Sequence, residues 1–188
     1  WTKQVASHFG GTRNGAIVHW PNGIKAKGEI RSQFHHVIDV APTILEVAGL
    51  PEPVLVNGVQ QRPIEGVSML YSFDNAKAPT QKEIQYYEIF GHRGLWYKGW
   101  KAVTEHGPIS GLSNFDKDKW QLFHTDEDRS EARDLSEQYP EKVKECYSEM
   151  MKQIEQFSDP NYITDAELQT AKEVLVRNEI RSTEKPSG

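Results

Sequence analysis

"IQYYEIFGHRGLWYKGWKAVTEH", residues 84–106, contains three short runs of aromatic and β-branched residues that are separated by glycine and lysine. Such runs, each closed by turn residues, are typical of antiparallel strands. A fourth run of the same kind, "KWQLFHT" at 119–125, follows a polar stretch at 107–119 that we interpret as a surface loop. The sequence therefore predicts a small four-stranded antiparallel sheet.

The residues after this sheet show a helical pattern. Between Pro140 and Phe157, apolar side chains recur on one side of a helix, which predicts that this helix lies across one face of the sheet; they are Val143, Tyr147, Met150, Met151, Ile154 and Phe157. Further on, Thr164 and Glu167 form a capping-box pattern that predicts another helix before a frayed end. We therefore expect an α+β domain at 81–158 and a tail helix at 159–188.

The N-terminal part of the chain has a different pattern of apolar and polar residues. "GAIVHW" at 15–20 is apolar without alternation and ends at Pro21-Asn22-Gly23, which predicts a strand covered on both faces and closed by a turn. Asp39 and Gly49 bound a predicted helix as N-cap and stop signal. A buried strand followed by a helix is typical of an α/β sandwich with a largely parallel sheet. Because one strand cannot form a sheet, we interpret 1–80 as the C-terminal end of such a domain, whose other strands lie upstream.

Composition excludes some classes of partner. The chain has 188 residues and a formal net charge of −5, so it lacks the basic surface that nucleic acids select, and we expect no nucleic-acid partner. Its apolar runs are far shorter than the roughly 20 residues that span a bilayer, so no membrane partner is predicted. Cys146, the one cysteine, cannot form an internal disulfide, and its place on an amphipathic helix indicates a packing role. The sequence does not indicate the cellular compartment.

Few residues indicate chemistry by themselves. His35 and His36 are adjacent, so on a strand they would point to opposite faces and could not share a metal ion without a further ligand from elsewhere; the favoured interpretation is a pair in a loop or at the entry of a helix, with one member hydrogen-bonded to the backbone. The acidic stretch 124–134 lacks the regular spacing of a calcium loop and is interpreted as a solvated turn. Gly10 and Gly11 form only a pair, which favours close backbone packing over phosphate binding.

Four segments, in this order, carry a resemblance to a known family. They are "WTKQVASHFGGTRNGAIVHWPNGI" at 1–24, "FHHVIDVAPTILEVAGLP" at 34–51, "PIEGVSM" at 63–69 and "WQLFHTDEDRSEARDLSEQYPEKVKE" at 120–145. Together they resemble the C-terminal half of a bacterial arylsulfatase, a member of the alkaline phosphatase superfamily. The resemblance extends from residue 1 to about residue 157, and it implies an alkaline-phosphatase-like α/β sandwich followed by the small sheet and its helix.

The resemblance also implies a reaction. Sulfatases of this family hydrolyse sulfate esters with a formylglycine nucleophile and a divalent cation, usually calcium, while lysines and histidines bind the sulfate. Lys3, which precedes the glycine pair, corresponds to one of these lysines and is expected to place an ammonium against the developing negative charge. His8 is a candidate substrate-binding residue of the same pocket, and Arg13 is interpreted as structural. Phe9 departs from the family, in which a glutamate often precedes the glycines.

The rest of the machinery is not expected in these residues. Cys146 lacks the Cys-x-Pro/Ala-x-Arg context of the modified residue, and in this family the cation ligands belong to the upstream part of the protein. We therefore expect the fragment alone to be inactive, with a small-molecule sulfate ester and the upstream catalytic portion of the same chain as partners. Two alternatives stay open: a phosphodiester or phosphonate ester hydrolase of the same superfamily, and a non-catalytic module that binds glycans or a partner through Tyr86, Tyr87, Trp96, Trp100 and Trp120.

Overall fold

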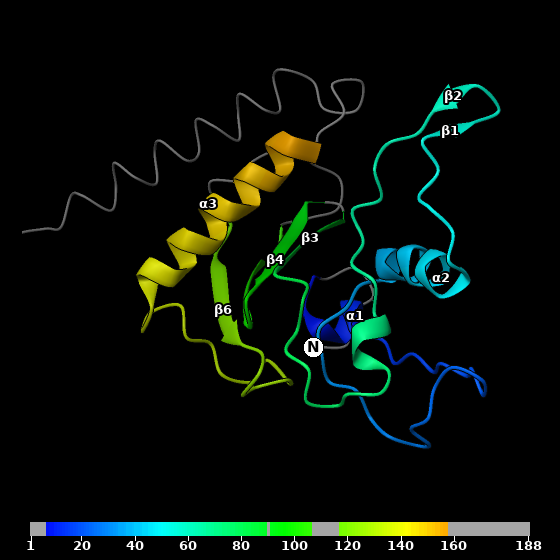
Figure 1. Cartoon of the computed structure of the whole chain (residues 1–188). Helices are drawn as coiled ribbons and strands as arrows, with labels where there is room; N and C mark the ends of the chain where they lie inside the picture. Colours follow the sequence, from blue (N-terminus) through cyan, green and yellow to red (C-terminus); the bar gives the residue numbers. More distant parts are fainter. Residues whose placement is uncertain (1–6, 90, 107–116, 158–188) are drawn as a thin grey trace, which may run out of the picture. The chain divides into compact units, whose positions relative to one another are not determined.

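The chain forms two compact units. The computed structural model describes residues 7–89, 91–106 and 117–157. One unit, here the helix unit, comprises residues 14–85; the other, the sheet unit, joins the residues up to Arg13 to those from Tyr86 onward. Figure 1 shows the elements of both units. None of the described helices is both long enough and apolar enough to cross a membrane. The predicted boundary near residue 80 stays a prediction.

The four predicted strands are confirmed. They are β3 (Ile84–Ile89), β4 (His92–Tyr97), β5 (Trp100–Thr104) and β6 (Trp120–His124), hydrogen-bonded in the order β3-β4-β5-β6. The β4–β5 and β5–β6 pairs are antiparallel. Lys98 and Gly99 join β4 to β5 with φ angles of 49° and 84°, the left-handed values of a tight hairpin turn whose twist matches that of the strands.

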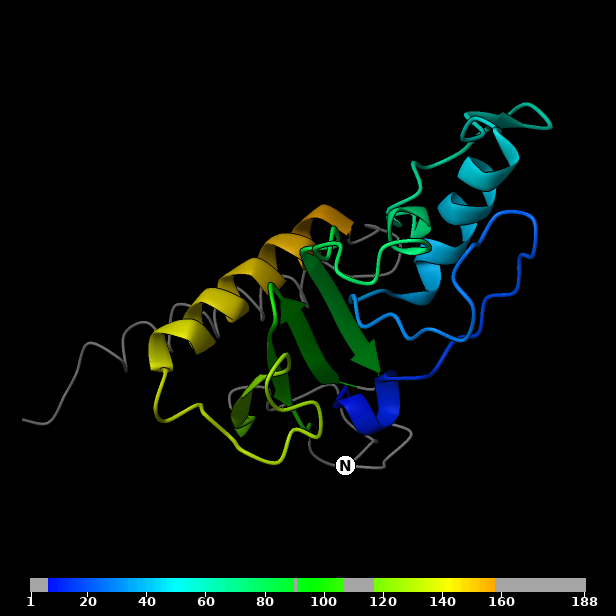
Figure 2. The ribbon, with the colours of Figure 1, turned by 60° about the horizontal axis from the view of Figure 1, so that its bottom comes forward.

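One face of this sheet packs against helix α3 (Pro140–Phe157), as the sequence predicts (Figures 1 and 2). The strand register places Leu95, Ala102 and Leu122 side by side on this face, and all three are fully buried. The buried residues of α3 are Cys146, Tyr147, Met150 and Met151. Cys146 is thus confirmed as a packing residue, and burial raises the pKa of its thiol to about 12.

The segment 7–13, which includes the short helix α1 (Phe9–Thr12), covers the opposite face. The Ser7 hydroxyl donates a hydrogen bond to the carbonyl of His92 at 2.8 Å. A Cβ atom at Gly94 would lie only 2.8 Å from the Ser7 Cβ, so the glycine permits this close approach. The His8 ring meets the buried Phe123 ring edge-on, with centroids 6.0 Å apart. The sheet is therefore enclosed by two segments that are about 130 residues apart in the sequence.

The helix unit contains the predicted helix and one element that the sequence analysis missed. A 3₁₀ turn, η1 (Val37–Asp39), leads into α2 (Val40–Ala48). For residues 57–72 the sequence predicts a loop with a helical turn after Ser68, and that turn is η2 (Leu70–Ser72). The missed element is a hairpin of β1 (Leu55–Val56) and β2 (Val59–Gln60) around Asn57-Gly58, whose positive φ angles fit a two-residue turn. The Asn-Gly pair between valines was its signal in the sequence.

The predicted strand at 15–20 is wrong for this structure. No strand is assigned there, and Ile17 and Val18 are 98% and 49% exposed. Only the turn that follows is present, where Gly23 and Ile24 donate backbone hydrogen bonds to the Trp20 carbonyl. A strand buried on both faces needs hydrogen-bonding neighbours. Among the described residues, none pairs with this segment as a strand, and Ile17 and Val18 stay exposed.

The end of α2 gives a testable prediction. Gly49 has a φ of 63° and donates to Glu46 O, while Leu50 donates to Leu45 O. A Cβ at Gly49 would meet no atom within 4 Å. Gly49→Ala should therefore cost only the strain of the left-handed backbone, about 1 kcal/mol in the free energy of unfolding by urea. Gly15→Ala is the control: its Cβ also meets nothing, its φ is not positive, and a comparable loss there would refute the argument.

Candidate functional site

The segment that carries the predicted site residues begins outside the described part of the chain. Lys3 lies among the residues that the structure does not describe, so its catalytic role stays a prediction. His8 is fully buried, and its Nε2 atom lies 2.8 Å from Gln121 Oε1. Burial lowers the pKa of His8, although the bond to Gln121 and the charge of Glu131 oppose this shift. The neutral ring is therefore favoured, and its role in substrate binding stays a prediction.

A buried ion pair lies next to His8. Lys101, on β5, and Glu131, in the turn after β6, have side chains that are 0% and 1% exposed, with Nζ and Oε1 3.1 Å apart. The Lys101 ammonium also donates to Thr12 Oγ1 at 3.3 Å and lies 3.9 Å from the centroid of the Phe9 ring. Burial lowers the pKa of Lys101 to about 8, against the attraction of Glu131. The Lys101 ammonium thus contacts α1 as well as Glu131.

Neither member of the pair was predicted as a site residue. In a run such as "WKAVT" a lysine resembles an ordinary surface residue of a strand, and Glu131 lies in the stretch predicted to be a solvated acidic turn. The turn prediction holds for Asp128, whose exposed carboxylate accepts from the backbone N–H groups of Ser130, Ala132 and Arg133. Glu131 is the exception, because it is buried and has a φ of 53°.

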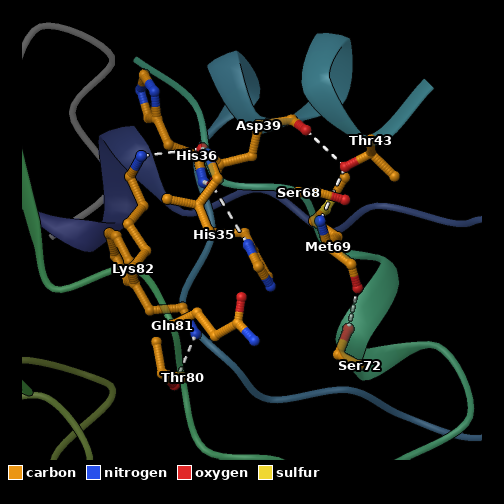
Figure 3. A network of polar contacts seen from close by, with 12 residues as sticks. His35, His36, Asp39, Thr43, Ser68, Met69, Ser72, Thr80, Gln81 and Lys82 are labelled. Atoms are coloured by element: carbon orange, nitrogen blue, oxygen red, sulfur yellow. Dashed lines mark hydrogen bonds and ion pairs between the residues drawn. The ribbon is translucent and has the colours of Figure 1, made fainter. Parts of the chain in front are cut away.

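A second polar network lies in the helix unit, around the fully buried Asp39 (Figure 3). Its carboxylate accepts from His36 N at 2.8 Å, Val67 N at 2.9 Å and Lys82 Nζ at 2.9 Å, and lies 3.3 Å from His35 Nδ1. Burial alone would raise the pKa of Asp39, but these bonds outweigh it and hold the pKa far below its usual value. Asp39 thus ties the start of α2 to two distant segments.

The two adjacent histidines belong to this network as predicted, at the entry of a helix. The His36 side chain accepts the Asp39 N–H in a capping box that opens η1. His35 Nε2 lies 3.2 Å from the Tyr71 hydroxyl. Burial and the nearby charge of Lys82 lower the pKa of His36. Neither the partnership of Lys82 nor that of Tyr71 had a signal in the sequence, because both come from remote turns.

The described residues offer no ready metal site. Within 7–89, 91–106 and 117–157, no group of three or more His, Cys, Asp or Glu side chains is arranged to hold a metal ion. The geometry instead shows two buried lysine–carboxylate pairs that hold segments together. The Lys101–Glu131 pair holds α1 against the sheet through Phe9 N and Thr12 Oγ1.

Most of the candidate aromatic platform contributes to packing. Trp96 is 3% exposed and donates to Thr125 Oγ1 at 3.0 Å. Trp120 meets Tyr147 of α3 edge-on at 5.4 Å, and Trp100 meets both His124 and Tyr139 in the same way. Burial raises the pKa of Tyr86, and the Tyr87 ring centroid lies 5.4 Å from Lys101 Nζ. Trp96, Trp100 and Trp120 thus contact other side chains of the sheet unit, which is typical of packing rather than of an open binding platform.

A family model and a curated relative connect this chain to sulfatases. Residues 8–159 match the family described as N-sulphoglucosamine sulphohydrolase, C-terminal. An uncharacterized sulfatase of Schizosaccharomyces pombe is 30% identical over 141 residues, which cover 72% of this chain and 24% of the relative. The chain thus spans about a quarter of the length of that relative.

Solved structures share the fold. A protein designated 6S-sulf, from a glycosaminoglycan-metabolism locus of Bacteroides thetaiotaomicron, has a TM-score of 0.58 at 19% identity, over 80% of this chain and 30% of that one. Ps i-CgsB has a TM-score of 0.54 at 19% identity, over 88% and 34%. The putative sulfatase yidJ of Bacteroides fragilis has a TM-score of 0.51 at 17% identity, over 77% and 30%. Because the family match covers most of its residues, the chain belongs to the sulfatase family described as N-sulphoglucosamine sulphohydrolase, C-terminal.

Proposed function

We propose that this chain is the C-terminal portion of an arylsulfatase, a sulfuric ester hydrolase that acts on small-molecule sulfate esters in its full-length form. The observation that carries the proposal is the match of residues 8–159 to a C-terminal sulfatase family, with only about a quarter of a sulfatase relative covered. The remaining part of such a protein would supply the nucleophile and would be the first partner of this chain.

The surface of the helix unit supports such a partner. Several large apolar side chains of this unit are more than half exposed, which is costly in water unless another surface covers them. They are Ile17, Ile30, Val37, Ile44, Leu50, Val54, Leu55 and Val59. An upstream catalytic portion of the same protein is the occupant that we propose, since it would cover these exposed apolar side chains.

The chemistry within this chain would rest on Lys3. A lysine ammonium aimed at a sulfate or leaving-group oxygen stabilises the negative charge that develops as the S–O bond breaks. His8 is buried and bonded to Gln121, and its direct contact with sulfate stays a prediction from the resemblance. Because the His8 ring already has a hydrogen-bonded partner, Lys3 is the stronger candidate.

The formylglycine and the calcium ion that the resemblance implies do not fit the described residues. The Cys146 thiol is buried in α3, and this burial raises its pKa to about 12. No described cluster of His, Cys, Asp or Glu could hold the cation. We therefore propose that the upstream portion supplies both groups and that the isolated chain is inactive.

The proposal is tested with the full-length protein and with this chain separately. The full-length protein should hydrolyse 4-nitrophenyl sulfate, and it should act at least 100-fold more slowly on bis(4-nitrophenyl) phosphate and on a phenylphosphonate ester. The isolated chain should release no product from any of them. A preference for the phosphodiester or phosphonate would replace the sulfatase proposal, and measurable affinity of the isolated chain for glycans, without hydrolysis by the full-length protein, would favour a binding module.

A further inference from the structure

His8 places a basic ring in the interior, where the segment 7–13 contacts the sheet. The residue is 0% exposed, and its ring meets the Phe123 ring edge-on. Its Nε2 atom lies 2.8 Å from Gln121 Oε1 on β6. Because an amide oxygen only accepts hydrogen bonds, Nε2 carries the proton of the neutral ring and donates it to this oxygen. A second proton on the ring would therefore enter the interior as a charge.

The buried charges next to His8 are already balanced. Lys101 on β5 and Glu131 in the turn after β6 form an ion pair with Nζ and Oε1 3.1 Å apart. Burial, the largest influence, lowers the pKa of His8 below its ordinary value of 6.5, and the Lys101 ammonium acts in the same direction. The bond to Gln121 and the charges of Glu131 and of Glu105, directly after β5, oppose this shift without reversing it.

The position of this ring is tied to the backbone of α1. The His8 carbonyl accepts from Gly11 N at 2.9 Å, from Thr12 N at 3.0 Å and from the Thr12 hydroxyl at 3.1 Å. The Phe9 N–H donates to Glu131 Oε2 at 2.6 Å, which fixes the next residue. A helix of four residues is not stable by itself in water, so α1 depends on such contacts. Expelling the ring from the sheet would therefore release the segment.

The sign of the pH dependence follows from the two states of the ring. Release returns the ring to water, where its pKa is the ordinary 6.5. The released state then binds a proton more readily than the docked state, so docking weakens as the pH falls below 6.5, by up to about tenfold for each pH unit. At neutral pH and above, neither state holds this proton, and docking keeps its full strength.

We propose that His8 is an acid-sensitive latch: it fixes the segment 7–13 to the sheet at neutral pH and releases the segment as the pH falls toward 5. The latch does not depend on the proposed function, because it requires only the contacts of the sheet unit.

The test is amide hydrogen exchange of the full-length protein at pH 7 and pH 5, with each rate corrected for the intrinsic rate at that pH. Lys101 keeps its charge in this interval, because its pKa is about 8. Protection of the segment 7–13 should fall about 3- to 30-fold from pH 7 to pH 5, the range that uptake of one proton allows, while the amides of β5 keep their protection. Constant protection of the segment would overturn the latch.

Two variants identify the sensor. His8→Gln keeps a neutral hydrogen-bond donor for Gln121 but takes up no proton in this interval, so its protection should agree at pH 7 and pH 5 within about twofold. His124→Gln is the matched control: it removes a histidine of the same sheet, with a side chain that is 24% exposed and pairs with Glu127, and it should keep the full pH dependence. An acid loss in His8→Gln as large as in the unaltered protein would refute the proposal.

A second measurement does not depend on how well His8→Gln folds. In the unaltered full-length protein with ¹³C-labelled histidine, NMR titration of the ring signals should give His8 a pKa below the 6.5 of an exposed histidine. A value at or above 6.5 would overturn the latch, because protonation would then favour the docked state. Neither measurement uses a sulfate ester, so a failure of the proposed function would leave both results valid.

Discussion

Asp39→Asn is expected to lower the free energy of unfolding of the helix unit by about 3–5 kcal/mol, the usual cost of leaving one member of a buried ion pair without its partner. The Lys82 side chain is only 4% exposed, so its ammonium cannot move into water without rearrangement. The amide of asparagine also cannot satisfy His36 N, Val67 N and Lys82 as the carboxylate does. Urea unfolding followed by fluorescence measures this loss.

Two comparisons make this prediction specific. Asp74→Asn changes an exposed carboxylate of the same unit that accepts from Lys25 N and Ala26 N, and it should cost no more than about 0.5 kcal/mol. Asp39→Asn/Lys82→Met removes both charges and should recover part of the stability lost in Asp39→Asn. Equal losses in Asp39→Asn and Asp74→Asn would show that the ion pair does not hold the unit together.

The pH dependence of the free energy of unfolding tests the role of Asp39 independently. Because the folded state holds the pKa of Asp39 far below its usual value, the contribution of the ionised carboxylate is complete above about pH 4 and is lost as the pH falls further. The protein should therefore lose stability between about pH 4 and pH 2, and the Asp39→Asn variant should lose less over this interval. An equal loss of stability in both proteins over this pH interval would contradict the role given to the Asp39 carboxylate.

Lys3→Ala is expected to lower kcat for sulfate ester hydrolysis by the full-length protein about 10²- to 10³-fold, the usual effect of removing one charge-stabilising group from a catalytic site. Lys3→Arg should restore little of this activity, because a planar guanidinium does not replace a compact ammonium. The measurement is kcat and KM for 4-nitrophenyl sulfate.

Lys152→Ala is the matched control for Lys3. Lys152 lies on α3 with a side chain that is 65% exposed, so its removal should leave kcat within about twofold of the starting value. Unfolding temperatures should agree among the three variants. A Lys3→Ala enzyme with full activity would show that the resemblance assigns the wrong lysine.

The sequence alone determined the regular elements of the sheet unit. The strands from Ile84 to His124 and helix α3 were predicted because their apolar periods and turn residues are local properties of the chain. The sequence also indicated the sulfatase family before the fold was known, since that signal lies in the order of short motifs. The tail helix predicted at 159–188, and residues 107–116 of the loop predicted at 107–119, lie outside the described residues, so they stay predictions.

Only the tertiary structure decided which side chains meet. Lys101 pairs with Glu131 and Asp39 pairs with Lys82 across 30 and 43 positions of sequence, and no local pattern marks either partner. The same cause explains the wrong strand at 15–20. Its apolar residues favour an extended conformation, but a strand forms only where neighbouring strands supply hydrogen bonds and cover both faces. The local preference of a segment for helix or strand follows from its own residues. Pairing between side chains or between strands depends on which distant residues the fold brings close.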